Sequence, residues 1–181
     1  MSETRPATDV VDAWLDGIRR HVNDLRSGTF EGRAGKDREA SYREAFDFLT
    51  PVAQAVLTTI NETLLAGSGQ VSVQPPEPDG RGGLIGSWTL SWPLLRQAVN
   101  RISGGHLRPV MIGAVFPAGF VHPHLVAGGP VDTRSDSLVA WPMQVVTAAE
   151  AATYEPLLWA IASAEVHDRI YQSSWAIIPG A

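Results

Sequence analysis

Leu84-Ile85-Gly86-Ser87-Trp88-Thr89-Leu90 is the stretch that decides the fold, because there the chain changes from a helical pattern to a strand pattern. Trp88, Leu90 and Trp92 occupy alternate positions, and alternate residues of a strand project from the same face. Residues 107–116 form a second, strongly apolar strand candidate, and residues 137–146 form a third. The middle of the chain therefore predicts a sheet with at least one apolar face.

Two helical regions precede this strand. Apolar residues recur every three or four positions from Thr8 to Leu25, which predicts an amphipathic helix capped by Thr8. A second helical region extends from Asp37 to Leu65, and its apolar residues between positions 46 and 65 cover more than one stripe. Thr50-Pro51 predicts a break or kink within it, because proline lacks a backbone donor and disfavours helix at the residue before it.

Turn-rich and helical segments flank the predicted strands. Residues 70–73 alternate weakly, whereas residues 75–80 predict a connector rich in proline and turn residues. Helical spacing returns at residues 93–102. Thr147-Ala148-Ala149-Glu150 is a capping-box sequence, which predicts the start of a last helix that kinks at Glu155-Pro156 and ends near Tyr171.

These elements predict an α+β fold. We expect an N-terminal helical pair, with the second helix broken near Pro51, to pack on a mainly antiparallel sheet followed by a C-terminal helix. A chain of 181 residues is long enough for a substantial core. We therefore predict one domain over residues 1–181, with a helical portion at 1–66 and a mixed portion at 67–181.

Composition excludes several classes of function. The formal net charge of −5 disfavours nucleic acid as the main ligand, since phosphate binding needs a concentrated basic surface. The chain has no cysteine, which removes disulfides, thiolate nucleophiles and sulfur-ligated metals. No window approaches the roughly 20 apolar residues needed to span a bilayer, and residues 1–8 carry no apolar signal core. We expect a cytoplasmic protein that does not act at a membrane.

The segment with the clearest chemical potential is Phe120-Val121-His122-Pro123-His124-Leu125. In an extended backbone, His122 and His124 would project to the same side and could share one metal ion or one substrate. Pro123 cannot donate to a sheet ladder, however, and in a polyproline conformation the two rings would diverge by roughly 120°. The pair is therefore expected at a sheet edge or in a loop.

Two kinds of chemistry suit this histidine pair. A neutral imidazole accepts a proton near physiological pH, so His122 and His124 are candidates for acid–base catalysis, with Asp132 as the carboxylate that orients a ring. The alternative is a divalent metal ion bound by His122 and His124. Further ligands or partners would then come from residues that stand at no diagnostic spacing, namely His106, Asp132, Asp136, Glu165, His167 and Asp168.

Aromatic residues near the predicted strand ends are candidates for a substrate pocket. An apolar pocket with a few polar groups is the usual small-molecule site, and large aromatic side chains alternatively fill the core. The candidate substrate-binding residues are Trp88, Trp92, Phe116, Phe120 and Trp141. The charged segment at residues 165–169 is expected to be a solvated helix face.

The sequence thus favours a small-molecule enzyme with a histidine-containing, aromatic-lined pocket. The alternative is a non-catalytic ligand-binding protein or a subunit of a larger complex. In that case the apolar helix at residues 46–65 and the apolar tail at residues 175–178 would be docking surfaces. Charged residues make up only 18% of the chain, so either function is compatible with a homo-oligomer or a protein partner that covers apolar surface.

Overall fold

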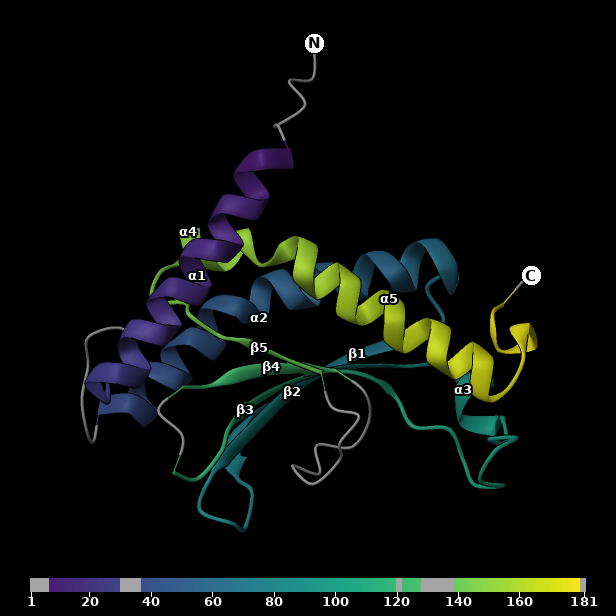
Figure 1. Cartoon of the computed structure of the whole chain (residues 1–181). Helices are drawn as coiled ribbons and strands as arrows, with labels where there is room; N and C mark the ends of the chain where they lie inside the picture. Colours follow the sequence, from purple (N-terminus) through teal and green to yellow (C-terminus); the bar gives the residue numbers. More distant parts are fainter. Residues whose placement is uncertain (1–6, 30–36, 120–121, 128–138, 180–181) are drawn as a thin grey trace.

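The computed structural model describes residues 7–29, 37–119, 122–127 and 139–179 (Figure 1). The elements in chain order are α1 (Ala7–Ser27), α2 (Asp37–Leu64), β1 (Gln70–Pro78), β2 (Leu84–Ser91), α3 (Pro93–Gln97), β3 (Val110–Phe116), β4 (His124–Ala127), β5 (Val139–Pro142), α4 (Ala148–Thr153), α5 (Glu155–Gln172) and a final 3-10 turn, Trp175–Ile177. This arrangement confirms the predicted α+β class, with an N-terminal helical pair and a helix at the C-terminal end.

The sheet is a simple antiparallel meander. Its strands lie in the order β1-β2-β3-β4-β5, and every neighbouring pair is antiparallel. Helices α2 and α5 pack against each other and against the sheet: α2 covers β1 to β3, and α5 covers β3 and β4 (Figure 1). The mainly antiparallel sheet expected from the sequence is confirmed.

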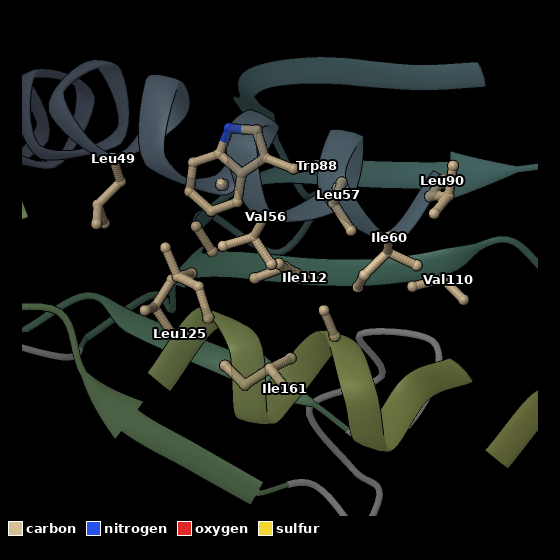
Figure 2. Packing of buried hydrophobic residues seen from close by; sticks show 14 of the residues in the cluster. Leu49, Val56, Leu57, Ile60, Trp88, Leu90, Val110, Ile112, Leu125 and Ile161 are labelled. Atoms are coloured by element: carbon tan, nitrogen blue, oxygen red, sulfur yellow. The ribbon is translucent and has the colours of Figure 1, made fainter. Parts of the chain in front are cut away.

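The core lies between this sheet and the two helices. Trp88 stands opposite Val73 on one side and Ile112 on the other, so alternation along β2 produces an apolar row across three strands. The indole of Trp88 stacks on Phe46 of α2 with ring centroids 4.3 Å apart, and its Nε1 donates to Thr50 Oγ1 at 2.9 Å. Figure 2 shows Trp88 beside Leu57, Val56 and Ile112 in this layer.

Gly86 permits this close approach of α2 to β2. A Cβ atom at position 86 would lie 2.6 Å from Cε2 of Phe46, far inside van der Waals contact. The glycine that interrupts the apolar pattern of residues 84–90 therefore makes room for the aromatic ring that stacks on Trp88.

Helix α2 continues through Pro51, so the predicted break near Pro51 is wrong. The Thr50 hydroxyl donates to the carbonyl of Phe46 at 2.8 Å, inside the helix, instead of capping a new segment. The apolar residues on both sides of Pro51, Leu49 and Ala53, are fully buried. Burial on both sides of the proline holds the helix on the sheet and offsets the missing hydrogen bond.

Strand β1 extends through Pro75 and Pro76, where the sequence predicted a connector. β1 is the edge strand of the sheet, so a residue without an N–H can be accommodated there. The register shifts between Gln74 and Glu77, which is the irregularity expected around two prolines. Elsewhere the elements are shorter than predicted, since α3 ends at Gln97 and β5 covers only Val139–Pro142.

The C-terminal region confirms the capping box and corrects the interpretation of the charged segment. The Thr147 side chain accepts a hydrogen bond from the Glu150 amide, and the helical region is interrupted at Tyr154 between α4 and α5. Residues 165–169 are not simply a solvated face, because Glu165 and Arg169 are only 4% and 2% exposed. Arg169 donates to Glu165 Oε2 at 2.7 Å and to the Arg108 carbonyl at 2.8 Å, which ties α5 to the segment before β3.

The apolar tail docks on the protein itself. Ile177 and Ile178 are buried, and Trp92 Nε1 donates to the Ile177 carbonyl at 2.6 Å. Among the residues that the structure describes, no helix is both long and apolar enough to cross a membrane.

Candidate functional site

Helix α1 lies beside β5, the strand at one edge of the sheet (Figure 1). The part of α1 that faces the protein includes polar residues. Along this face Gly17 approaches the side chain of Gln144, whose Oε1 lies 3.4 Å from the position of a Cβ at Gly17. Asp24, two turns further along, is only 8% exposed. At these two positions the helix faces the protein with a small and a polar residue.

Asp24 and His122 form the centre of the site. His122 Nε2 lies 3.2 Å from Asp24 Oδ2, although the two residues are far apart in the sequence. An ionised carboxylate only accepts hydrogen bonds, so Nε2 carries the hydrogen in this contact. The Thr29 hydroxyl donates to the other carboxylate oxygen, Oδ1, at 2.8 Å. Asp24 is thus held from both sides, and it fixes the orientation and the tautomer of the buried His122 ring.

His21 joins the two histidines of the β4 region. It lies one turn before Asp24 on α1, and its ring centroid is 4.1 Å from that of His122 and 5.8 Å from that of His124. Burial and the neighbouring His122 lower the pKa of His21, whereas Asp24 opposes that shift. Three imidazoles and one carboxylate therefore meet between α1 and the start of β4.

His124 is the first residue of β4 and stands opposite Val115 and Pro142. Side chains alternate along a strand, so His124 projects from the face opposite to Leu125, which belongs to the core. Burial, with contributions from His21 and His122, lowers the pKa of His124 to about 4. This imidazole is neutral at physiological pH, with a free-base form that can accept a proton.

Two buried polar atoms along the same face of α1 lack a protein partner in the described part of the chain. They are His21 Nδ1 and Gln144 Nε2. Buried polar atoms in folded proteins are nearly always hydrogen-bonded, and exceptions are commonly explained by water, an ion or a bound ligand. His21 belongs to the cluster of three rings, whereas Gln144 lies beside Gly17 of α1 and extends the polar site beyond that cluster.

The arrangement does not fit a metal ion. Within residues 7–29, 37–119, 122–127 and 139–179, no group of three or more His, Asp or Glu side chains is placed so that it could hold one. His122 already bonds to Asp24, and the rings of both predicted ligands are directed at His21. Pro123 directly precedes β4, which begins at His124.

The four predicted pocket residues that the structure describes are core residues or pack against the core. Trp88 and Trp92 are fully buried with their N–H groups bonded inside the core, and Phe116 packs against Tyr42 with ring centroids 5.8 Å apart. Trp141 is half-buried opposite Leu125, on the core face of the sheet. Phe120 lies outside the described residues. The contacts of the described aromatic residues of the set are therefore contacts within the protein core.

The remaining candidates for a third partner are placed elsewhere. Glu165 and Asp168 both bond to Arg169 on α5, and His106 and His167 are exposed. Asp132 and Asp136 lie outside the described residues. The third and fourth members of the cluster are instead His21 and Asp24, which sequence reasoning missed.

One signal for His21 and Asp24 was present in the sequence. They stand three residues apart in a predicted helix and so share one face, away from the apolar stripe. That face looked like the solvent side of an amphipathic helix, and only the tertiary structure shows that it points inward. A comparison with known proteins gives no further assignment: no family model, no curated protein and no solved structure matches the chain.

Proposed function

We propose that the protein is an acid–base enzyme that acts on a small molecule, with His21, Asp24, His122 and His124 as its proton-transfer site. The observation that carries the proposal is the convergence of three imidazoles on one carboxylate at the junction of α1 and β4. Isolated structural histidines need one partner each, whereas a cluster of coupled imidazoles can hold and pass a proton.

In this proposal the exposure of each histidine determines whether it positions its neighbours or exchanges a proton with the substrate. His122 is buried and bonded to Asp24, so it acts as a positioning residue that keeps its neighbours oriented. His21 and His124 are half-buried and within reach of a bound molecule. Their lowered pKa values keep them neutral at pH 7, where each can accept a proton from a substrate.

The unpartnered atoms supply the substrate-binding part of the proposal. A ligand with a donor group can bond to His21 Nδ1 in its unprotonated form, and a ligand oxygen can accept from Gln144 Nε2. Both contacts would satisfy atoms that are otherwise buried without a partner, which favours binding of a polar small molecule. In this proposal Asp24 orients the ring of His122, and Asp132, the carboxylate predicted from the sequence, lies outside the described residues.

Ligand binding and proton transfer can both be tested by substituting the half-buried His124. We expect a polar metabolite from a screening panel to raise the melting temperature of the wild-type protein, by an amount equivalent to about 2.7 kcal/mol at a hundredfold excess over Kd. The effect should persist in His167→Gln, which changes an exposed histidine, and disappear in His124→Gln. Deuterium incorporation from D₂O into that ligand, lost in His124→Gln, would establish acid–base chemistry.

Two results would contradict the proposal. Equal stabilisation of the wild type, His167→Gln and His124→Gln would place any binding site elsewhere. Stoichiometric metal in protein purified without a polyhistidine tag, lost in His122→Ala/His124→Ala, would replace acid–base chemistry by metal binding.

A non-catalytic subunit is the second candidate. Its predicted docking surfaces do not support it, because the apolar residues of the segment 46–65 and Ile177 and Ile178 of the tail are largely buried in the chain's own core. The observation that favours it lies on α1, where Leu15, Ile18, Val22 and Leu25 are exposed.

A further inference from the structure

Helix α1 carries an apolar stripe that no described part of the chain covers. The exposed fractions of its residues are 44% for Leu15, 56% for Ile18, 38% for Val22 and 53% for Leu25. The face that contacts the protein is a different one, marked by Gly17 and Asp24. Large side chains that recur along one exposed helix face indicate an interaction surface.

The spacing of the stripe is that of a coiled-coil seam. Its four residues are separated by steps of three, four and three positions, which is the a and d pattern of a heptad repeat. With Leu15 and Val22 at position a, the e positions are occupied by Asp12, Arg19 and Arg26. These e positions flank the apolar seam on the side of α1 that points away from the protein. All three are exposed, so a second helix laid on the seam would meet them.

Apart from the buried Asp24, the charged residues whose side chains the structure describes are segregated along α1. Asp12 and Asp16 lie in its N-terminal half, whereas Arg19, Arg20 and Arg26 lie in its C-terminal half. A parallel pair of such helices would place like charges together, and an antiparallel pair would place each acidic half beside a basic half. The polar side of α1 is not uniformly basic, which disfavours an anionic membrane surface as the occupant.

We propose that α1 binds α1 of a second copy of the chain, antiparallel, about a twofold axis beside Arg19. Asp12 and Arg26 stand seven positions on either side of Arg19, so Asp12 of one copy is level with Arg26 of the other. In the same register, Ile18 of one copy lies at the height of position 20 of the other copy along the helix axis. That height is midway between the Ile18 and Val22 side chains of the other copy. The apolar residues therefore interdigitate as knobs and holes, while opposite charges flank both ends of the seam. The two Arg19 side chains meet at the axis, where each is paired with Asp16 of its own helix at 2.6 Å.

None of the histidines takes part in the pairing, so the pairing can be tested independently of the proposed function. It also accounts for an amphipathic helix whose polar face is turned inward. Over the described side chains of α1, the face that contacts the protein is polar, and the pairing gives the exposed apolar stripe a partner.

Sedimentation equilibrium of the full chain tests the pairing. We expect a concentration-dependent dimer for the wild type, a monomer for Ile18→Glu and an unchanged dimer for Asn23→Glu, which adds the same charge to α1 at an exposed position off the stripe. At a protein concentration low enough that the wild type is monomeric, the unfolding midpoints of both variants should equal that of the wild type, because both positions are exposed. A wild type that stays monomeric at millimolar concentration, or a dimer that survives Ile18→Glu, would overturn the proposal.

The orientation is tested by single cysteines, since the chain has none of its own. A short bismaleimide should link two copies of Ile18→Cys, which lie close to the axis. It should not link Leu25→Cys, because those residues are about 18 Å apart along an antiparallel pair at a rise of about 1.5 Å per residue. Efficient linking at both positions would show parallel helices and overturn the assignment. Asp12→Arg alone should weaken the dimer, and adding Arg26→Asp should restore it.

Discussion

The sheet core and helix α1 are held in place by different interactions. Trp88, Phe46 and Ile112 interlock across the sheet and α2, and nearly all polar atoms there are satisfied by short contacts such as that of Trp88 with Thr50. Helix α1 instead contacts the protein through Asp24 and His21 and leaves its apolar stripe outside. The core should be insensitive to pH, whereas the attachment of α1 should depend on it.

The largest effect is expected from truncation of the core. Trp88→Ala removes the indole that stacks on Phe46 and should lower the free energy of unfolding by about 3–5 kcal/mol. Denaturant unfolding measures this value. Trp175→Ala is the matched control, because Trp175 is 64% exposed. Equal effects of the two substitutions would mean that Trp88 is not a core residue.

A smaller loss is expected from adding one methyl group to the core. Gly86→Ala forces a Cβ against the ring of Phe46 and should cost about 1–3 kcal/mol through overpacking. Gly105→Ala is the control, since its nearest neighbour would lie 3.7 Å away and its backbone needs no special conformation. Thermal unfolding compares the two. If Gly86→Ala is as stable as Gly105→Ala, the contact of α2 with β2 is looser than described.

Acid should weaken the α1 region more than the core. The pKa of His124 falls from 6.5 to about 4 on folding, and the pKa of His21 also falls, so the unfolded chain binds more protons between these values. Stability is therefore full above pH 6.5 and declines as the pH falls toward 4. The part due to His124 should be about 1–2 kcal/mol, after allowance for solvent screening of a half-buried ring.

The variant His124→Gln isolates this contribution. Because glutamine does not titrate, the difference between wild type and variant in unfolding free energy should change between pH 7 and pH 4.5. A constant difference across that range would show that His124 has the same pKa in the folded and unfolded chain.

The smallest effect on global stability is expected at Asp24. Asp24→Asn removes the charged acceptor for His122 but leaves the sheet core intact. The free energy of global unfolding should therefore fall by less than about 1 kcal/mol. Amide exchange in α1 should nevertheless accelerate roughly 10- to 100-fold, because a hydrogen bond to a charged group contributes about 1.5–3 kcal/mol to its local attachment. Hydrogen exchange measures both regions at once. Uniform acceleration in β2 and β3 would show that α1 is part of the core.

The two regions also differ in how far the sequence predicts them. Alternation at Trp88 and Leu90 predicts β2 because a strand's period is a local property. The same reasoning fails at Pro51 and at Pro75, where burial in one case and an edge position in the other override the local preference of proline.

The candidate site was predicted only in part, for a related reason. His122 and His124 stand out because they are close in sequence, but their partners His21 and Asp24 lie about a hundred residues earlier. Periodicity shows that α1 has two faces and does not show which one the protein covers. The face that turned inward is the polar one, against the usual preference of amphipathic helices.

The most direct test of the account is a histidine side-chain titration followed by NMR. If α1 and β4 enclose a polar site as described, the ring of His124 must titrate near pH 4, because burial and two neighbouring imidazoles disfavour its charged form. His21 should also titrate below 6.5. Titration of both rings at 6.5, the value of an unperturbed histidine, would mean that the cluster is not assembled and would contradict the proposed site.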